Sequence, residues 1–536
     1  MAFTAGALAI VLLGYFLRSL GTEWGLPEPQ GFGLSLHPDE RAVMDSLAHT
    51  RISQGDFCVN SHFVLSEGQF QYSVWAVVLF AAKSVGWIDV VPDESSDPDA
   101  SASVLALLRQ MVVLTDCISL ALLLFLGRRR FGMLGATAAG LVFAVLPAFV
   151  VSAHFARTHT PANLFVLLEF FVADRLGSRL ARREPTARLE WLLLGGLSGL
   201  AFATRYNLLS IGLFPAILSL QCLFQRESTL RRRVAGPLLG LGGLLIGLGV
   251  GMPSLITEPG LVMDEFSFRL RISNPQQFTG WSIVSVERVW PYLSWLIPIG
   301  TWPLLWPMLF AAIPIATAIS IMKRDWIALS VPVFALFNLY YTAKGYWDPA
   351  WVRAALPFLA GSVLALAYVI SQLRPWRRLQ WATLSICVLL CLPSAWYDFQ
   401  YDLAMKERDP LLRAKDWIDA NVKGGESVSF MTQTGVLRHW PQSAEERGSL
   451  FAPETQELTA RVMSSLEKME WLVVARCQGQ DLPAGFMSRY TIRELFENAH
   501  VSQSSVLKHE RWPPDWVYPF GKVWILKAIA PLRRGR

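Results

Sequence analysis

Apolar runs long enough to cross a lipid bilayer recur along most of the chain, separated by polar connections. A helix needs about 20 predominantly apolar residues to span the hydrocarbon core. On this pattern we predict eleven spanning helices, at 2–20, 105–126, 133–151, 161–176, 191–205, 207–224, 234–252, 302–322, 326–342, 354–371 and 380–396. The run 234–252 is rich in glycine, which predicts close packing of this helix against a neighbour.

Three connections are long and of mixed polarity, namely 21–103, 253–301 and the segment that follows the last span, 397–536. Within the first, 69–86 is apolar but contains Lys83 and lies between polar stretches. A twelfth span there would reverse the side of every later connection, so we interpret 69–86 as an interfacial or re-entrant helix. The acidic, turn-rich stretch 92–102 predicts a mobile loop.

The C-terminal segment alternates between two kinds of pattern. Helical periodicity is seen at 409–421 and again at 454–469, and short strand patterns at 427–431 and 471–475. Alternation of this kind is typical of a small α/β domain. The sequence therefore predicts a mainly α, polytopic membrane protein, with a transmembrane domain at 1–396 and an external α/β domain at 397–536.

Basic residues are concentrated in alternate connections, at Arg128–Arg130, Arg175–Arg188, Arg231–Arg233, Lys323–Arg324 and Arg374–Arg378. By the positive-inside rule these connections are cytoplasmic. The first span lacks a basic n-region and an obvious cleavage site before Arg18, which favours a retained helix over a signal peptide. We therefore predict a multi-pass protein of the plasma or inner membrane, with a cytoplasmic N-terminus and an extracytoplasmic C-terminus. The net charge of +6 then reflects topology, and nothing indicates nucleic-acid binding.

The six cysteines do not form a disulfide framework, because four of them lie in predicted spans. Cys58 and Cys477 are both on the predicted external side, and a bond between them is left open. Two acidic residues, Asp116 and Glu169, also fall inside predicted spans, where we expect them to contact other helices. No zinc-binding spacing of Cys or His is present.

The motif His37-Pro38-Asp39-Glu40 lies in the first external connection. Pro38 biases the residue before it toward an extended conformation, so the motif predicts a turn or a helix start. Carboxylates are favoured in a first helical turn, and this alone is enough to explain Asp39 and Glu40. The functional alternative is that one of them is a general base that takes a proton from a hydroxyl at the membrane surface.

If the leaving group of this reaction is a phosphate, its negative charge needs cationic hydrogen-bond donors near the same surface. The candidates on the predicted outer side are Arg205, Arg353, Arg157, His154, His159 and Lys344. Arg205 is the most informative, because it lies between two apolar runs with no room for a substantial loop. A charge at that depth is costly unless it is paired or meets an anion. Snorkelling to the interface is an alternative for Arg205 and for Arg353.

Several of these features occur together in a known family. The segments are HPDE at 37–40 with the helix after it, and the stretches 109–132, 152–171, 195–209, 351–367 and 409–428. In this order the chain resembles the GT-C superfamily of integral-membrane glycosyltransferases. Within it, the chain is similar to the protein-mannosyltransferase-like group (glycosyltransferase family 39-like), which includes the aminoarabinose transferases. The resemblance extends over nearly the whole chain, through short motifs.

The resemblance implies a cell-envelope enzyme that transfers a hexosyl or pentosyl group, with inversion, from a polyprenyl-phosphate donor to an external protein, lipid or glycan acceptor. Asp39, with Glu40 beside it, would be the base, and His37 belongs to the same motif. Arg205 and Arg353 match basic residues of the family and would bind the donor phosphate. We predict the same role for His154, Arg157 and Lys344 from their place on the predicted outer side.

The chain departs from the family at one position. Many members have a second acidic residue in the next external loop, roughly where this chain has His159 or Thr160. Its absence weakens a metal-bridged mechanism, so we predict an enzyme with no metal and no cofactor. Two other classes stay open, a flippase or transporter of a polar lipid and a non-catalytic membrane scaffold.

Overall fold

The computed structural model describes residues 2–28, 35–95, 97–182, 184, 188–224, 230–273, 286–345, 352–422, 426, 428–432, 470–476, 490–504, 507 and 522–529. The chain divides into two compact units. The larger unit contains Met1–Ser19, Val43–Glu94 and Leu107–Asp398, and the smaller unit contains Leu20–Ala42, Ser95–Ala106 and Phe399–Arg536.

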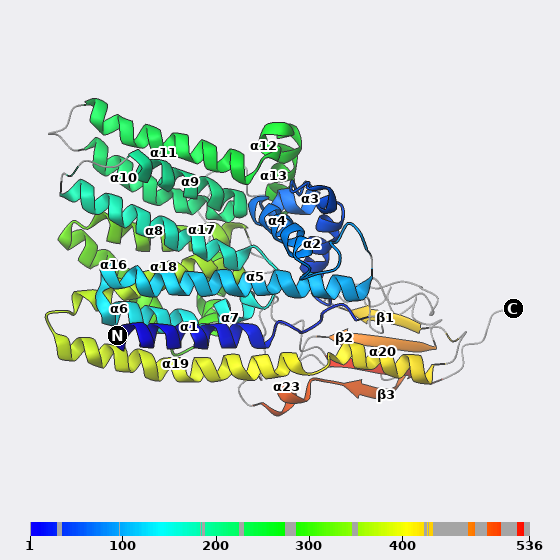
Figure 1. Cartoon of the computed structure of the whole chain (residues 1–536). Coiled ribbons are helices and arrows are strands. Elements are labelled where there is room, and N and C mark those ends of the chain that lie inside the picture. Colours follow the sequence, from blue (N-terminus) through cyan, green and yellow to red (C-terminus); the bar gives the residue numbers. More distant parts are fainter. Residues whose placement is uncertain are drawn as a thin grey trace. The chain divides into compact units, whose positions relative to one another are not determined.

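Every one of the eleven predicted ranges is helical (Figure 1). The helices are α1 (Ala2–Leu20), α5 (Pro98–Phe125), α6 (Gly127–Ala144), α7 (Pro147–Ala153), α8 (His159–Ala181), α9 (Arg188–Thr204), α10 (Leu213–Leu223), α11 (Leu230–Gly251), α16 (Trp306–Lys323), α17 (Trp326–Gly345), α18 (Leu356–Gln372) and α19 (Arg377–Lys406). Among the described residues, seven helices are long and apolar enough to cross a membrane, or eight if the bent pair α6 and α7 is one span. The protein is therefore mainly α and a multi-pass integral membrane protein.

Shorter elements lie between these helices. They are α2 (Pro38–Ala48), η1 (Ile52–Gln54), α3 (His62–Glu67), α4 (Phe70–Ser84), η2 (Tyr206–Gly212), α12 (Ser254–Thr257), α13 (Pro259–Ser273), α14 (Val286–Pro291), η3 (Tyr292–Leu296), α15 (Ile297–Thr301) and η4 (Val352–Ala355). Helix α4 confirms a helix within 69–86, and its depth in the membrane stays a prediction. The expected loop at 92–102 is partly wrong, because α5 already begins at Pro98. The Asp97 carboxylate accepts the Asp99 N–H at 3.3 Å there, so acidic residues cap the helix.

The predicted continuous span 133–151 is also wrong in one respect, because α6 and α7 meet at a bend of 53°. Pro147 has no N–H, and Leu146 before it is extended, so the helix ends. The guanidinium of Arg18 donates to the freed carbonyls of Phe143 (3.0 Å) and Ala144 (2.8 Å). Its Nε also pairs with Asp116 of α5 at 2.6 Å, which confirms that Asp116 contacts another helix.

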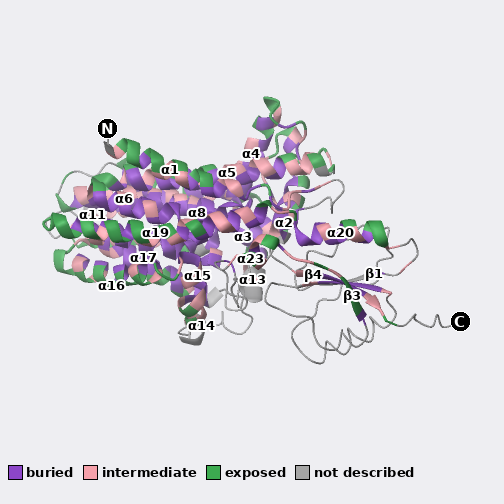
Figure 2. Cartoon of the chain, turned by 90° about the horizontal axis from the view of Figure 1, so that it is seen from below, coloured by how far each residue is buried: buried purple, intermediate pink, exposed green. Residues whose placement is uncertain are grey.

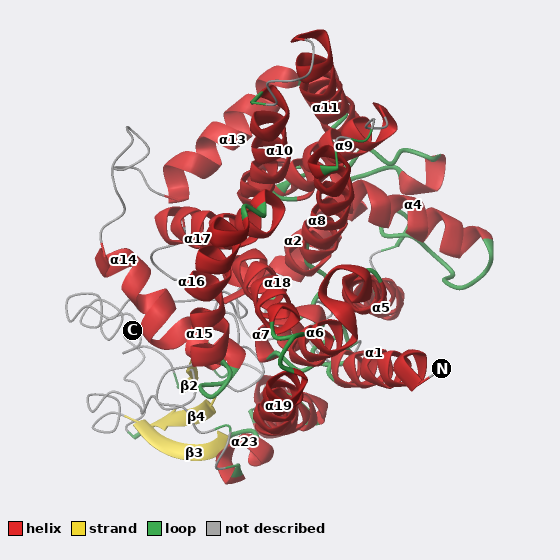
Figure 3. Ribbon diagram, turned by 90° about the vertical axis from the view of Figure 1, so that its left-hand side faces the viewer, coloured by secondary structure: helices red, strands yellow, loops and turns green. Residues whose placement is uncertain are grey.

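Helix α18 forms the core of the larger unit. Almost all of its side chains are buried, and it packs against α6, α8, α16 and α17 (Figure 3). Exposed side chains are found instead on helices such as α11, α16 and α19, as Figure 2 shows. Glu169 of α8 accepts a hydrogen bond from Ser198 of α9 at 2.5 Å, so this acidic residue also contacts another helix, as expected.

Helices α9 and α11 pack with their backbones in close approach, as the glycines of 234–252 predict. A Cβ atom added to Gly243 would lie 3.0 Å from the amide nitrogen of Gly196 and closer still to the carbonyl oxygen of Leu192. Gly195 and Gly199 of α9 likewise face the backbone of α11. This is the small-residue packing that brings helices together in membranes, where lipid supplies no hydrophobic drive.

The connections of the larger unit form two groups, one at each end of its helices. At one end α3, α4, α12 and α13 gather (Figure 1), and Gln69 donates to the Ser254 hydroxyl at 2.8 Å. At the other end Arg130 bonds Asp174 (3.0 Å) and Asp325 (2.5 Å). This grouping agrees with the alternation of basic and mixed connections in the sequence. Which end faces the cytoplasm stays a prediction.

The smaller unit holds a four-stranded sheet in the order β1-β2-β4-β3. The strands are β1 (Val428–Thr432), β2 (Trp471–Arg476), β3 (Tyr490–Phe496) and β4 (Lys522–Ala528), with helices α20 (Pro410–Asn421) and α23 (Ala499–Gln503). The pair β1–β2 is parallel, whereas β2–β4 and β3–β4 are antiparallel. Helix α20 and strands β1 and β2 confirm the α/β prediction, and the expected helix at 454–469 lies outside the described residues.

Candidate functional site

The motif at 37–40 opens helix α2. His37 precedes the helix and accepts the Asp39 N–H on its Nδ1 at 3.2 Å, so this nitrogen carries no proton. Pro38 occupies the first helical position, where a missing N–H costs nothing. The helix start predicted from the sequence is therefore confirmed, with Asp39 and Glu40 in the first turn.

The two adjacent carboxylates differ in their surroundings. Glu40 is fully buried and accepts a hydrogen bond from the Ser35 hydroxyl at 2.9 Å. The same hydroxyl accepts the His37 N–H at 3.1 Å, so Glu40 fixes the turn that leads into α2. Asp39 is only partly buried. Of the two, Asp39 is the carboxylate that solvent and a substrate can reach.

Arg41 supplies a positive charge next to this pair. Its Nε donates to the backbone carbonyl of Ser35 at 2.5 Å. Burial lowers the pKa of Arg41 to about 10, so the guanidinium stays protonated at neutral pH.

Arg205 lies at the end of α9 in the larger unit and is buried, with 3% of its surface exposed. Its Nη1 contacts the Glu67 carboxylate, the Thr158 hydroxyl at 2.9 Å and Nδ1 of His159 at 3.2 Å. The snorkelling alternative does not describe this side chain, because its guanidinium is enclosed by protein. Arg205 is instead the cation of a buried polar cluster that contains the Glu67 carboxylate.

The partner Glu67 is held in place by its own helix, α3. Gly68 ends this helix with a φ of +131°, and a Cβ there would lie 2.5 Å from the Thr204 carbonyl oxygen. Tyr206 donates its hydroxyl to the Leu65 carbonyl, and Leu65, Tyr206 and Met252 share one apolar cluster. The first connection is therefore seated directly on the end of α9, where glycine permits the close approach.

The remaining predicted cations lie at different places in the larger unit. His154 is fully buried at the end of α7, with Nε2 3.3 Å from the Leu17 carbonyl. Arg157 is buried in the turn before α8, and Arg353 is partly exposed in η4. The side chain of Lys344 lies outside the described residues. The structure thus brings His159 to Arg205, and a common site for His154, Arg157, Arg353 and Lys344 stays a prediction.

His37, Asp39 and Glu40 belong to the smaller unit, whereas Arg205 and the other predicted cations belong to the larger one. Their convergence on one site stays a prediction. Within the described parts of the chain, no three His, Cys, Asp or Glu side chains gather to hold a metal ion, and independence of a metal stays a prediction too. Cys58 is a free thiol 3.6 Å from the Ser254 hydroxyl, and Cys477 is outside the described residues.

Sequence reasoning did not find Glu67, which is the carboxylate that meets Arg205. The two residues are 138 positions apart, so no local spacing reports their pairing. One signal was available, because Glu67-Gly68 ends a short polar stretch just before an apolar helix. Glycine commonly follows the last residue of a helix, and an acidic residue at that end is unfavourable for the helix dipole unless a cation meets it.

No protein-family model matches the chain, and no curated protein matches it. Among solved structures, it is similar to ArnT from Cupriavidus metallidurans bound to undecaprenyl phosphate, with 14% identity over 100% of this chain and 99% of that one and a TM-score of 0.46. The same ArnT in its apo state matches at 16% identity, over 98% of each chain, with a TM-score of 0.42.

The oligosaccharyltransferase of Archaeoglobus fulgidus, in complex with zinc and sulfate, is similar over 88% of this chain and 67% of its own, at 12% identity and a TM-score of 0.43. ArnT is a GT-C aminoarabinose transferase, and both neighbours are glycosyltransferases. With TM-scores below 0.5 these similarities carry no argument about this chain, whose chemistry rests on its own residues.

Proposed function

We propose that this protein is a membrane glycosyltransferase that moves a sugar from a polyprenyl-phosphate donor to a hydroxyl of an acceptor. The observation that carries the proposal is the division of labour at the start of α2. Glu40 is buried and holds the turn, while its neighbour Asp39 is partly exposed. This arrangement suits an ionised general base at a membrane surface.

In the proposed reaction the Asp39 carboxylate takes the proton of the acceptor hydroxyl. The acceptor oxygen then forms a bond to the anomeric carbon of the sugar, with inversion, while the bond from that carbon to the phosphate oxygen breaks. Polyprenyl phosphate leaves as the anion, which needs cationic hydrogen-bond donors. We propose Arg205 as one such hydrogen-bond donor to the phosphate. Thr158 and His159 both contact its Nη1.

The ion pair with Glu67 limits the contribution of Arg205 to phosphate binding. Its carboxylate already neutralises the guanidinium, so a donor phosphate has to share Arg205 with Glu67 or displace it. A second anion near a compensated pair gains less than it would near a lone cation. Arg157 and Arg353 are therefore proposed to supply further positive charge to the phosphate.

The test uses purified full-length protein in liposomes with a radiolabelled polyprenyl-phosphate sugar. Transfer of the label from the lipid to an acceptor supports the enzyme, whereas movement of the lipid across the membrane without transfer would support a flippase. Asp39→Asn is expected to lower transfer by about 10²- to 10⁴-fold, the usual contribution of a general base. Binding of undecaprenyl phosphate should be unchanged.

The matched control is Asp45→Asn. Asp45 lies in the same helix, and its side chain is 76% exposed. This variant removes the same charge from α2 and is expected to transfer at the wild-type rate. Comparable loss of activity in both variants, or substantial activity in Asp39→Asn, would show that Asp39 is not the base.

A further inference from the structure

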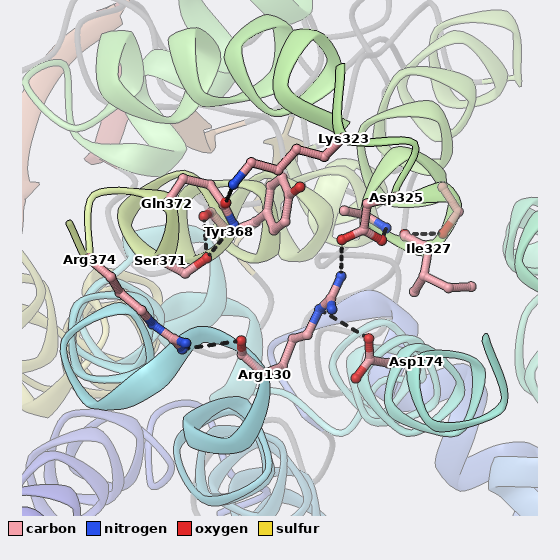
Figure 4. A network of polar contacts seen from close by, with 11 residues as sticks. Arg130, Asp174, Lys323, Asp325, Ile327, Tyr368, Ser371, Gln372 and Arg374 are labelled. Atoms are coloured by element: carbon pink, nitrogen blue, oxygen red, sulfur yellow. Dashed lines mark hydrogen bonds and ion pairs between the residues drawn. The ribbon is translucent and has the colours of Figure 1, made fainter. Parts of the chain in front are cut away.

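The arginines at the end of the larger unit that holds Arg130 fall into two sets with different surroundings. One set is neutralised by carboxylates. Figure 4 shows Arg130 between Asp174 and Asp325. Farther along the chain, Arg175 and Arg179 both bond Glu190, at 2.8 and 3.0 Å. The positive charge of this set is therefore largely compensated within the protein.

The second set carries its charge to the surface. Arg374 donates to the Arg130 backbone carbonyl at 3.4 Å, which places the connection between α18 and α19 against the start of α6 (Figure 4). Arg377 and Arg378 follow it and are exposed. None of these three arginines has an acidic partner among the described residues. Arg128, Arg129 and Arg324 are likewise exposed without an acidic partner among the described residues, so the feature that distinguishes Arg377 and Arg378 is the groove that they line.

Arg377 and Arg378 line an open groove together with apolar side chains. The groove has a volume of about 660 Å³ and is lined by residues Pro375, Trp376, Arg377, Arg378 and Leu379. Trp376 is 63% exposed, and an exposed tryptophan at the end of a spanning helix is typical of the membrane–water interface. The groove therefore lies at the level of lipid headgroups.

An exposed apolar strip continues from this groove along α19. It consists of Leu379, Ile386, Leu389 and Leu392, whose successive spacings of seven, three and three residues place them on one broad face of the helix. In a multi-pass membrane protein such a face lies against acyl chains. A ligand that fits both parts has an anionic head and apolar chains.

We propose that this groove binds an anionic phospholipid. Its phosphodiester accepts hydrogen bonds from the guanidinium groups of Arg377 and Arg378, whose planar forks suit phosphate, and its acyl chains lie along the exposed face of α19. The site is distinct from the start of α2 and from Arg205, and it does not depend on the transferase activity.

The experiment is native mass spectrometry of the full-length protein released from nanodiscs that contain phosphatidylcholine with a minority of phosphatidylglycerol. Wild-type protein is expected to retain phosphatidylglycerol. The double variant R377Q/R378Q should bind it roughly 20- to 30-fold more weakly, since each basic residue near the surface adds about fivefold to the attraction of anionic lipid. Each single variant should lose about fivefold, which keeps the test open if the double variant does not fold.

The matched control is R175Q/R182Q, which removes two arginines of the neutralised region. Both side chains are 74% exposed, and their contacts are with Glu190 and Glu184. This control should retain phosphatidylglycerol at the wild-type level. Equal loss in both double variants would reduce the effect to general surface charge and overturn the site, and retention in R377Q/R378Q would overturn it as well.

Discussion

The packing of α9 against α11 can be tested with two adjacent glycines of α11. Gly243 faces α9, and a Cβ there would lie 3.0 Å from the Gly196 nitrogen and closer still to the Leu192 carbonyl oxygen. Gly242 points elsewhere, and a Cβ there would meet nothing within 4 Å. The substitutions Gly243→Ala and Gly242→Ala therefore add the same methyl group to the same helix, one inside the interface and one outside it.

The size of the effect follows from these distances. Carbon atoms pack best at about 3.5–4.0 Å, so Gly243→Ala forces the two backbones apart by at least roughly 0.5 Å. A radial gap of this size forfeits about a quarter of the dispersion energy of each contact along the interface. Overpacking of this kind costs typically about 1–3 kcal/mol. Gly242→Ala has no such cost and gains up to about 1 kcal/mol from the better helix propensity of alanine.

The assay is thermal unfolding of the purified protein, with all variants in the same detergent. The measured quantity is the fraction of protein that stays monodisperse after heating to each temperature. Gly243→Ala is expected to lower the apparent Tm, while Gly242→Ala leaves it unchanged or raises it slightly. Gly243→Val should lower it further, because a larger side chain needs a wider separation. If the two alanine variants unfold at the same temperature, the close approach of α9 and α11 is not a source of stability.

Two further predictions concern charged pairs. Glu67→Gln removes the carboxylate that neutralises buried Arg205, so we expect lower thermal stability and tighter binding of undecaprenyl phosphate, measured by thermophoresis. Weaker binding would mean that Glu67 positions Arg205 for the phosphate instead. The hydrogen bond from Lys83 lowers the pKa of Glu94 below its usual 4.5, so this pair stabilises the end of α4 above that pH and loses its effect as the pH falls through the lowered value. Hydrogen exchange of α4, corrected for the intrinsic pH dependence, should show this loss in the wild type and its absence in Lys83→Gln.

Hydropathy was sufficient to locate the helices, because every predicted range is helical in the structure. Among the described residues, seven or eight of these helices are long and apolar enough to cross a membrane. It did not reveal the bend between α6 and α7, since the apolar run is unbroken through Pro147. The packing of α11 could be predicted because it depends on glycine composition. Strands β3 and β4 were not predicted, although Lys522–Ala528 contains the β-branched and aromatic residues that strands favour.

The partners in the polar contacts inside the larger unit could not be predicted from local sequence patterns. Arg18 meets Asp116 across 98 residues and Arg205 meets Glu67 across 138, and both partners are chosen by helix packing. What the sequence does report is the cost of such charges in an apolar run, which requires that some partner exists. It identified Asp116 and Arg205 as residues that need one, and packing decided which residue it is.

The motif at 37–40 shows how a helix start and a general base can coexist. Successive residues of a helix point about 100° apart, so Asp39 and Glu40 cannot serve the same surroundings. Glu40 turns inward and meets Ser35, which accounts for an acidic residue in the first turn without any chemistry. Asp39, by contrast, is partly exposed. The capping explanation therefore accounts for Glu40, and proton transfer stays our proposal for Asp39.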